Sequence, residues 1–388
     1  MQRKYSFFIS LASLIACSST HTMYKNSHQY GPLPTDSITS EEQAIIVDYK
    51  ATHDDDGFAK NHDYAYEKYR TLMAKALNDP CDQRFTNAVL NRSSGRQDLP
   101  LMQRALECGA SPDIKSGGAP IIEQADSLDI VQLLVKYNVS MQARDYSTVL
   151  HAACNAKCPA NILKFYLNNA GVDVNYRKEN NGSPINSWAR SSLGIVMSLY
   201  HCFKPSSLRT ELQNNWARLK TPYLPDAEKK LVLLFLAGAD VAYEPKYGKS
   251  PLGYLQKEIK DAEIVRYKTS VAQKDSENNI TELAEDHPTE FVEYRHLDLE
   301  QISKIIKAYA KLAEHLVALI TLQKHKNDLP DTYATLTNHL KQCVNKEQID
   351  DVQETLEQIK NTPSLKDEFS SAYTGFLCSL SQDTNNIQ

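Results

Sequence analysis

The sequence of 388 residues predicts an all-α protein in which short helical units repeat and are followed by a bundle of longer helices. Three observations support this fold class. A short apolar helix followed by a tight turn returns several times between residues 85 and 252. Apolar residues then recur at helical spacing in four segments after residue 297. Glycine is scarce, at 13 residues, which fits a helical chain and disfavours phosphate-binding loops.

The N-terminus has the pattern of a signal peptide. Arg3 and Lys4 precede an apolar run from Tyr5 to Ala16, and a polar segment follows at once. Because these 12 residues are too few to cross a bilayer as a helix, we do not expect a transmembrane anchor here. The run ends in Leu14-Ile15-Ala16-Cys17, which resembles the lipobox of bacterial lipoproteins.

The lipobox resemblance implies that residues 1–16 are removed and that Cys17 receives lipid. It also implies that the protein is a membrane-anchored lipoprotein of the bacterial cell envelope. The alternative is an ordinary secretory signal that is cleaved near Ala16 and gives a secreted protein.

Residues 17–40 are polar and contain Gly31-Pro32-Leu33-Pro34, so we interpret them as a flexible tether behind the lipidated cysteine. Two overlapping capping boxes, Thr39-x-x-Glu42 and Ser40-x-x-Gln43, predict a helix that begins near Glu41. A second helix is expected over about Tyr64 to Leu77, where apolar residues recur at helical spacing. Together these helices, within residues 41–84, are expected to cap the open end of the repeats that follow.

The repeat segment covers residues 85–267. Each clear copy begins with a short Pro- or Leu-containing motif and ends with a turn that follows an apolar helix. Proline fits the first helical position because its missing N–H would be unpaired there, and glycine fits the turn because it adopts a left-handed conformation. The starts are Gly118-Ala119-Pro120-Ile121, Thr148-Val149-Leu150-His151-Ala152-Ala153, Gly182-Ser183-Pro184-Ile185 and Gly248-Lys249-Ser250-Pro251-Leu252. The turns are Cys108-Gly109-Ala110-Ser111-Pro112-Asp113, Gly171-Val172-Asp173-Val174-Asn175 and Gly238-Ala239-Asp240-Val241.

These starts and turns resemble the Thr-Pro-Leu-His-x-Ala start and the Gly-Ala-Asp-Val-Asn turn of ankyrin repeats, whose unit is 33 residues. If Gly109, Asn138, Gly171 and Gly238 are equivalent, the steps between them are 29, 33 and 67 residues. The last step is close to two periods, so we infer a hidden unit within it. The resemblance therefore implies an ankyrin-repeat solenoid of about six degenerate units.

The hidden unit is expected to use Leu193 to Phe203 as its second helix. The unit after it is expected to pair Leu208 to Lys220 with Ala227 to Ala237. Residues 268–296 are mostly polar and are interpreted as a linker. Four amphipathic helices in residues 297–388 are expected to form a C-terminal helical bundle that resembles no family known to us.

The remaining composition limits the possible chemistry. A net charge of −5 without a basic cluster argues against nucleic acid as a partner. His151, Cys154 and Cys158 have helical spacing, but zinc needs a fourth ligand and none is evident, so we interpret them as structural. We identify no catalytic residue, no metal site and no cofactor, and we expect a protein that is not an enzyme.

Ankyrin repeats imply a scaffold that holds a protein partner on its hairpins and first helices. Aromatic and cationic residues in the predicted hairpins are the expected contacts, because such side chains dominate binding energy. They are Arg144, Tyr146, Tyr176, Arg177, Tyr243, Lys246 and Tyr247. Two alternatives remain open: an enzyme with an unrecognised site in the C-terminal helices, and an ankyrin effector that acts on host proteins.

Overall fold

The computed structural model places two compact units, Met1–Ser140 and Met141–Gln388. The part of the chain it describes is mostly helical, which confirms the predicted all-α class. Described residues are 33, 39, 40, 42, 43, 46, 62–78, 82–141, 149–155, 158–169, 173–176, 183–192, 223–245, 248–277, 299–346 and 349–384. The predicted signal peptide, Cys17 and nearly all of the predicted tether lie outside these residues.

The predicted capping box at Thr39 is confirmed. The Thr39 N–H donates to Glu42 Oε2 at 2.8 Å, and the Glu42 N–H donates to Thr39 Oγ1 at 3.3 Å. Helix α4 (His62–Ala76) matches the second predicted helix. The two segments are joined because Lys75 Nζ lies 2.9 Å from a carboxylate oxygen of Glu42.

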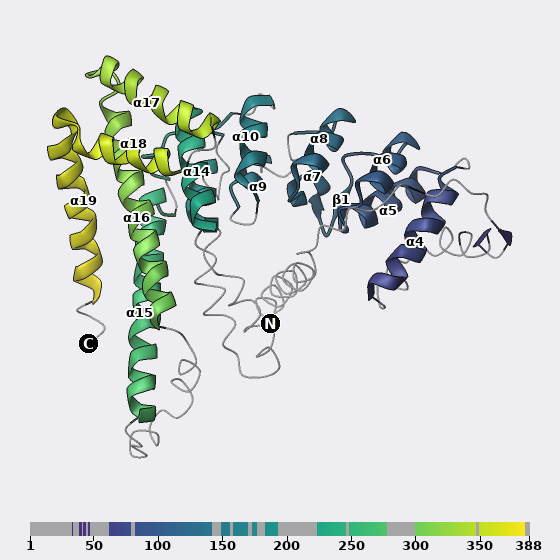
Figure 1. Cartoon of the computed structure of the whole chain (residues 1–388), viewed down its shortest axis with the longest axis horizontal. Helices are drawn as coiled ribbons and strands as arrows, with labels where there is room; N and C mark the ends of the chain where they lie inside the picture. The colour runs from purple at the N-terminus through teal and green to yellow at the C-terminus, as the bar shows by residue number, and fades with distance from the viewer. Residues whose placement is uncertain are drawn as a thin grey trace, which may run out of the picture. The chain divides into compact units, whose positions relative to one another are not determined.

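The first unit continues with short helices that pack in pairs (Figure 1). Helix α5 (Gln83–Ser94) packs on α6 (Leu99–Glu107), and α7 (Ile121–Gln124) packs on α8 (Leu128–Lys136). A two-stranded antiparallel hairpin joins the pairs, with Ser116 of β1 (Lys115–Ser116) opposite Ala119 of β2 (Ala119–Pro120). Helix α6 also contacts α8, so the two pairs stack. Their shared core includes Phe85, Leu90, Leu101, Met102, Ile121, Val131 and Leu134, which are all nearly inaccessible to solvent.

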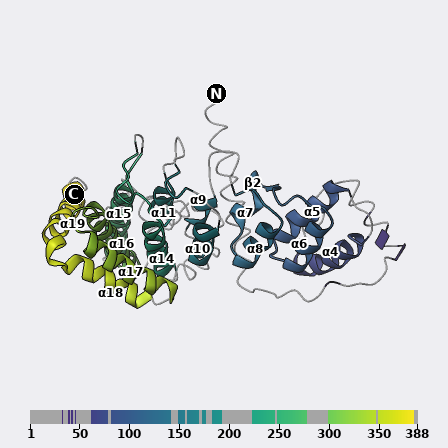
Figure 2. The same cartoon turned by 90° about the horizontal axis from the view of Figure 1, so that it is seen from above.

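Three pairs stack in the second unit. They are α9 (Val149–Ala153) with α10 (Ala160–Asn169), α11 (Pro184–Ser192) with α14 (Tyr223–Leu236), and α15 (Pro251–Glu277) with α16 (Leu299–Lys324). The first helices α9, α11 and α15 pack in one row, and the second helices α10, α14 and α16 pack in another (Figure 2). Pro184 and Pro251 each occupy a first helical position, as the sequence predicted.

Three further helices complete the second unit: α17 (Pro330–Asn345), α18 (Ile349–Asn361) and α19 (Pro363–Thr384). Together with α16 they confirm the four helices predicted after residue 297. Helices α17 and α18 pack on α14, and Lys164 of α10 reaches the backbone oxygen of Val344 in α17 at 3.5 Å. They therefore cover the row of second helices, while α19 packs on α15, α16 and α18.

The predicted linker of residues 268–296 begins too early. Lys268 to Glu277 continue helix α15, which packs along α16. The sequence did not reveal this because the segment is polar, yet Thr269 within it is fully buried and donates to the Val265 oxygen. Residues 278–298 lie outside the described part of the chain.

Candidate functional site

The turns that follow the second helices α6, α8 and α14 close in the same way. Gly109, Asn138 and Gly238 all have a positive φ, of 91°, 60° and 88°. This confirms the prediction that each supplies a left-handed turn residue, a conformation that glycine and asparagine adopt at least cost. At each turn the N–H of this left-handed residue donates to the carbonyl oxygen of the residue three positions earlier in the chain. The N–H of the next residue donates to the carbonyl oxygen five positions earlier. The five-back bonds are Ala110 to Ala105 at 3.0 Å, Val139 to Leu134 at 3.2 Å and Ala239 to Leu234 at 2.9 Å.

This pair of bonds is the Schellman motif, which satisfies the last carbonyls of a helix. The second helices α6, α8 and α14 therefore end with the same geometry, and the first helix α5 ends with it too at Gln97, whose φ is 57°. Gly171, the remaining predicted turn residue, lies outside the described residues.

Side chains join neighbouring turns within each unit. In the first unit the Ser140 N–H donates to Asp113 Oδ1 at 2.7 Å. In the second unit the Asp240 N–H donates to Asn175 Oδ1 at 2.8 Å, and Asn175 Nδ2 donates to the Gly238 oxygen at 2.9 Å. Asp113 follows Gly109 by four residues and binds Ser140, which follows Asn138 by two. Asn175 follows Gly171 by four residues and binds Asp240, which follows Gly238 by two. We call the linked turns of each unit its turn face.

The link from Asn175 to Gly238 and Asp240 corrects the predicted repeat count. The 67-residue step suggested a hidden unit stacked between these turns, but the two turns are direct neighbours. Helix α14 pairs with α11 and packs on α10, so Ala227 to Ala237 belong to the pair that begins at Pro184. Residues 193–222, in which the hidden unit was sought, lie outside the described part of the chain.

The C-terminal helix α16 continues the same kind of bonding at the last turn. Gln323 Nε2 donates to the Ala239 oxygen at 2.8 Å, and Gln323 Oε1 accepts from the Val241 N–H at 3.1 Å. One amide therefore binds the turn from the side opposite Asn175. The last turn is held between a repeat side chain and a C-terminal side chain.

Of the predicted contact residues, Tyr176 and Tyr243 are described. Tyr176 follows Asn175 on the turn face, is 36% exposed, and packs edge-on against His151 with ring centroids 6.3 Å apart. Tyr243 is half-buried, and its N–H donates to the Asp240 oxygen at 3.2 Å. Both therefore lie beside the linked turns. The other predicted contacts, Arg144, Tyr146, Arg177, Lys246 and Tyr247, lie outside the described residues.

The His151, Cys154 and Cys158 trio has no metal-binding geometry. Cys154 is fully buried, and this burial raises the pKa of its thiol. The nearby Lys230 ammonium donates to the Asn155 oxygen at 2.6 Å, and burial lowers its pKa. Within the described ranges no group of three His, Cys, Asp or Glu side chains could hold a metal ion. None of the described cysteines forms a disulfide with another described cysteine: Cys108, Cys154, Cys158, Cys343 and Cys378.

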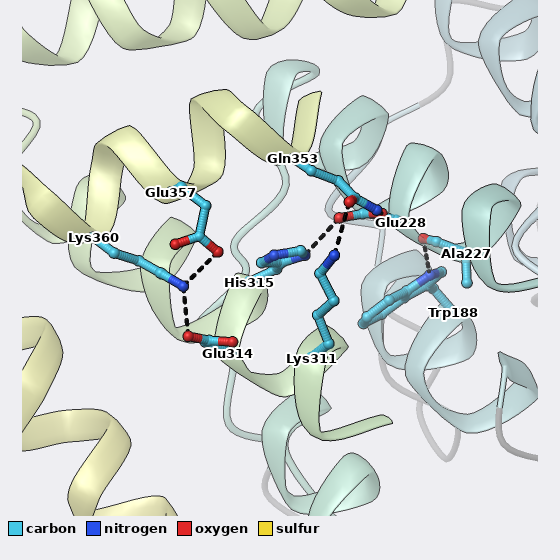
Figure 3. Close-up of polar contacts among 9 residues, drawn as sticks. All are labelled: Trp188, Ala227, Glu228, Lys311, Glu314, His315, Gln353, Glu357 and Lys360. Atoms are coloured by element: carbon cyan, nitrogen blue, oxygen red, sulfur yellow. Dashed lines mark hydrogen bonds and ion pairs between the residues drawn. The ribbon is translucent and has the colours of Figure 1, made fainter. Parts of the chain in front are cut away.

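Sequence reasoning missed a buried polar network where α14 meets the C-terminal helices (Figure 3). His315 Nδ1 in α16 lies 2.6 Å from Glu228 Oε1 in α14, and Gln353 Nε2 in α18 donates to Glu228 Oε2 at 2.9 Å. Lys311 in turn donates to Gln353 at 2.8 Å. His315 is 0% exposed, so this network joins three helices in the interior. No local sequence signal could have found it, since its members lie far apart in the chain.

Burial opposes the charge on Glu228, yet contacts with His315 and Gln353 hold the pKa of its carboxyl below the usual value. A second polar cluster lies beside it, where Lys360 Nζ contacts Glu314 at 2.5 Å and Glu357 at 2.7 Å (Figure 3). Trp188 Nε1 of α11 donates to the Ala227 oxygen at 2.9 Å, which ties the α11/α14 pair together. The repeats and the C-terminal helices of the second unit are thus one packed body.

No protein-family model matches this chain, and the curated proteins include no significant relative. Among the described helices, none is long and apolar enough to cross a membrane.

Proposed function

We propose that this protein is a lipid-anchored scaffold of ankyrin-type repeats that holds a protein partner at the bacterial cell envelope. The observation that carries the proposal is the turn face. In the first unit Asp113 links the Schellman turns at Gly109 and Asn138, and in the second unit Asn175 binds the Schellman turn at Gly238. A series of turns that is fixed in this way offers a preformed binding surface at little entropic cost.

The arrangement of the second unit favours one side for the partner. Helices α17 and α18 already cover the second helices α10 and α14. Among the described elements, the first helices α9 and α11 carry no such cover, and Tyr176, which packs against His151 of α9, has over a third of its surface exposed. An exposed tyrosine on a rigid support is a typical binding hot spot, because it adds contact area while losing little conformational freedom.

The buried network around His315 fits a supporting role in this scaffold. Glu228 and His315 are the described pair closest to acid–base chemistry, but both are buried and no substrate reaches them. Removing one partner of such a pair is strongly destabilising because the other charge is left uncompensated. The network therefore fixes the C-terminal helices against the last repeat pairs and keeps the turns in register.

The proposed localisation at the cell envelope rests on the sequence of residues 1–17. A lipid on Cys17 and a polar tether of 22 residues, 18–39, could place the folded units up to roughly 70 to 80 Å from a membrane surface. The alternative address is a host cell, with the same scaffold acting as a delivered effector.

Site-specific photo-crosslinking tests the binding surface and the address together. A photoreactive amino acid replaces Tyr176, and the control carries it at Tyr267, which is 48% exposed on α15. We expect one partner band from position 176 in bacterial membranes, with no such band from position 267. Equal crosslinking at both positions would remove the support for the turn face. A partner found only in host lysate would favour localisation in a host cell over the bacterial envelope.

A further inference from the structure

Helix α5 presents two faces of opposite character. Its buried face consists of Phe85, Thr86, Val89, Leu90 and Ser93. Its other face, which we call the arginine face, consists of Arg84, Ala88, Asn91, Arg92 and Gly95. At 3.6 residues per turn these five residues fall within about 100° of arc, and the two arginines stand about 12 Å apart along the axis.

Arg84 and Arg92 are not used by the fold. In the described part of the chain neither guanidinium forms an ion pair, a hydrogen bond or a ring contact. Helix α5 itself contains no acidic residue. Other described cations of the first unit have partners: Arg70 pairs with Asp98 at 2.8 Å, Lys75 with Glu42 at 2.9 Å, and Arg104 with Asn78 at 2.9 Å. The arginine face is therefore distinct from other basic positions in this unit.

Asn91 lies between the two arginines on the same face. Its side-chain oxygen is buried yet has no hydrogen-bond partner among the described residues. Because that oxygen is closed to solvent, an approaching chain meets the two arginines and not this acceptor. Ala88 is small, so it leaves the backbone of α5 between the arginines open to close approach by another chain.

We infer that the arginine face binds an acidic segment of the partner protein, with one carboxylate against each arginine. This inference rests on the proposed scaffold function and names the chemistry of its partner. Guanidinium groups bind carboxylates through paired hydrogen bonds, which gives two such sites a fixed spacing. Two arginines in a protein of net charge −5 are too few for a polyanion or an anionic membrane, which recruit clusters of basic residues.

The test uses the full-length chain and two short helical peptides rich in alanine. One peptide carries two glutamates eight residues apart, and the other carries glutamine at both places. We expect the glutamate peptide to bind at least about tenfold more tightly by fluorescence anisotropy. The double variant Arg84→Gln/Arg92→Gln should lose this preference. The matched control Arg104→Gln removes a charge from α6 in the same unit and should keep it.

Three results would overturn the inference: equal binding of the two peptides, equal loss in the Arg104→Gln control, or binding to vesicles of phosphatidylcholine and phosphatidylserine that depends on Arg84 and Arg92. Circular dichroism of each variant shows whether the fold is intact, and the single variant Arg84→Gln serves if the double variant unfolds. Crosslinking from Tyr176 is a separate readout. If it persists while peptide preference is absent, the scaffold proposal stands and this inference alone fails.

Discussion

Asn175 and Asp240 are joined by a hydrogen bond of 2.8 Å across 65 positions of sequence. The Asn175 side chain also donates to the Gly238 oxygen, so one amide fixes two backbone groups of the next turn. This contact sets the spacing of the two turns directly. The turn that carries Asn175 and the turn at Gly238 are therefore neighbours in the stack although they lie far apart in the sequence.

We predict that Asn175→Ala destabilises the second unit by about 1 to 3 kcal/mol, because it leaves the part-buried Asp240 N–H without its acceptor. Urea unfolding measures the loss. Asn338, which is exposed on α17, is the matched control, and Asn338→Ala should change stability by no more than about 0.5 kcal/mol. An equal effect of the two variants would show that the turn link contributes nothing specific.

Gln323→Ala should cost about 1 to 3 kcal/mol by the same reasoning, since it removes both bonds between α16 and the last turn. Because Gln323 and Asn175 bind the same turn, the double variant should deviate from additivity. Faster hydrogen exchange in Gln323→Ala is expected both in α16 and at Ala239 to Val241. Exchange that changes in α16 alone would argue against coupling of the C-terminal helices to the turn.

The buried carboxyl of Glu258 should make the stability of the folded protein depend on pH. Burial, aided by Asp261, raises the pKa of this carboxyl to about 7 although Lys257 and Lys249 lower it, and its Oε2 has no hydrogen-bond partner among the described residues. Between pH 4.5 and 7 the folded state keeps a proton that the unfolded state releases, so stability should fall as pH rises through this window. The shift from 4.5 to about 7 corresponds to about 3 kcal/mol at most.

Glu258→Gln should therefore remove this slope and leave the variant more stable than the wild type above pH 7. Urea midpoints measured across pH 4.5 to 8 provide the test. Glu300→Gln is the control, because the Glu300 side chain is 75% exposed and should leave the slope unchanged. A wild-type slope that survives in Glu258→Gln would assign it to another group.

The sequence was sufficient for features that depend on local chemistry. The left-handed residues Gly109, Asn138 and Gly238 were predictable because few residue types adopt a positive φ at low cost. The box formed by Thr39 and Glu42 was predictable because its donors and acceptors lie within one helical turn. Helix α17 was predictable because Pro330 marks its start.

Features that depend on tertiary packing could not be predicted. Helix α11 pairs with α14 although residues 193–222 lie between them in the sequence. Counting periods along the sequence therefore placed a hidden unit between the turns at Gly171 and Gly238. The hydrogen bond from Asn175 to Gly238 shows that these two turns are neighbours. The contact between His315 and Glu228 joins polar residues that carry no mutual signal in the sequence. Among the predicted contacts, Tyr176 is exposed as expected, while Tyr243 is half-buried and remains a weaker prediction.

The lipid anchor makes a separate prediction. Cys17→Ala should abolish labelling by a fatty-acid probe and move most of the protein out of the membrane fraction, because the acylated cysteine is the only proposed anchor. Cys378→Ala, which removes an exposed thiol from α19, is the control and should stay labelled. Unchanged labelling of Cys17→Ala would contradict the lipobox interpretation.

The affinity of the crosslinked partner for a turn-face variant tests the central claim most directly. In this variant Tyr176, Arg177, Tyr243 and Tyr247 are all replaced by alanine, and isothermal titration calorimetry measures binding of the purified partner. We predict a loss of at least about a hundredfold, since hot-spot residues each contribute about 2 kcal/mol or more. Helical content and melting temperature should stay close to wild type, and Tyr267→Ala should bind normally. Native affinity in the quadruple variant would contradict the turn-face account and direct attention to the C-terminal helices.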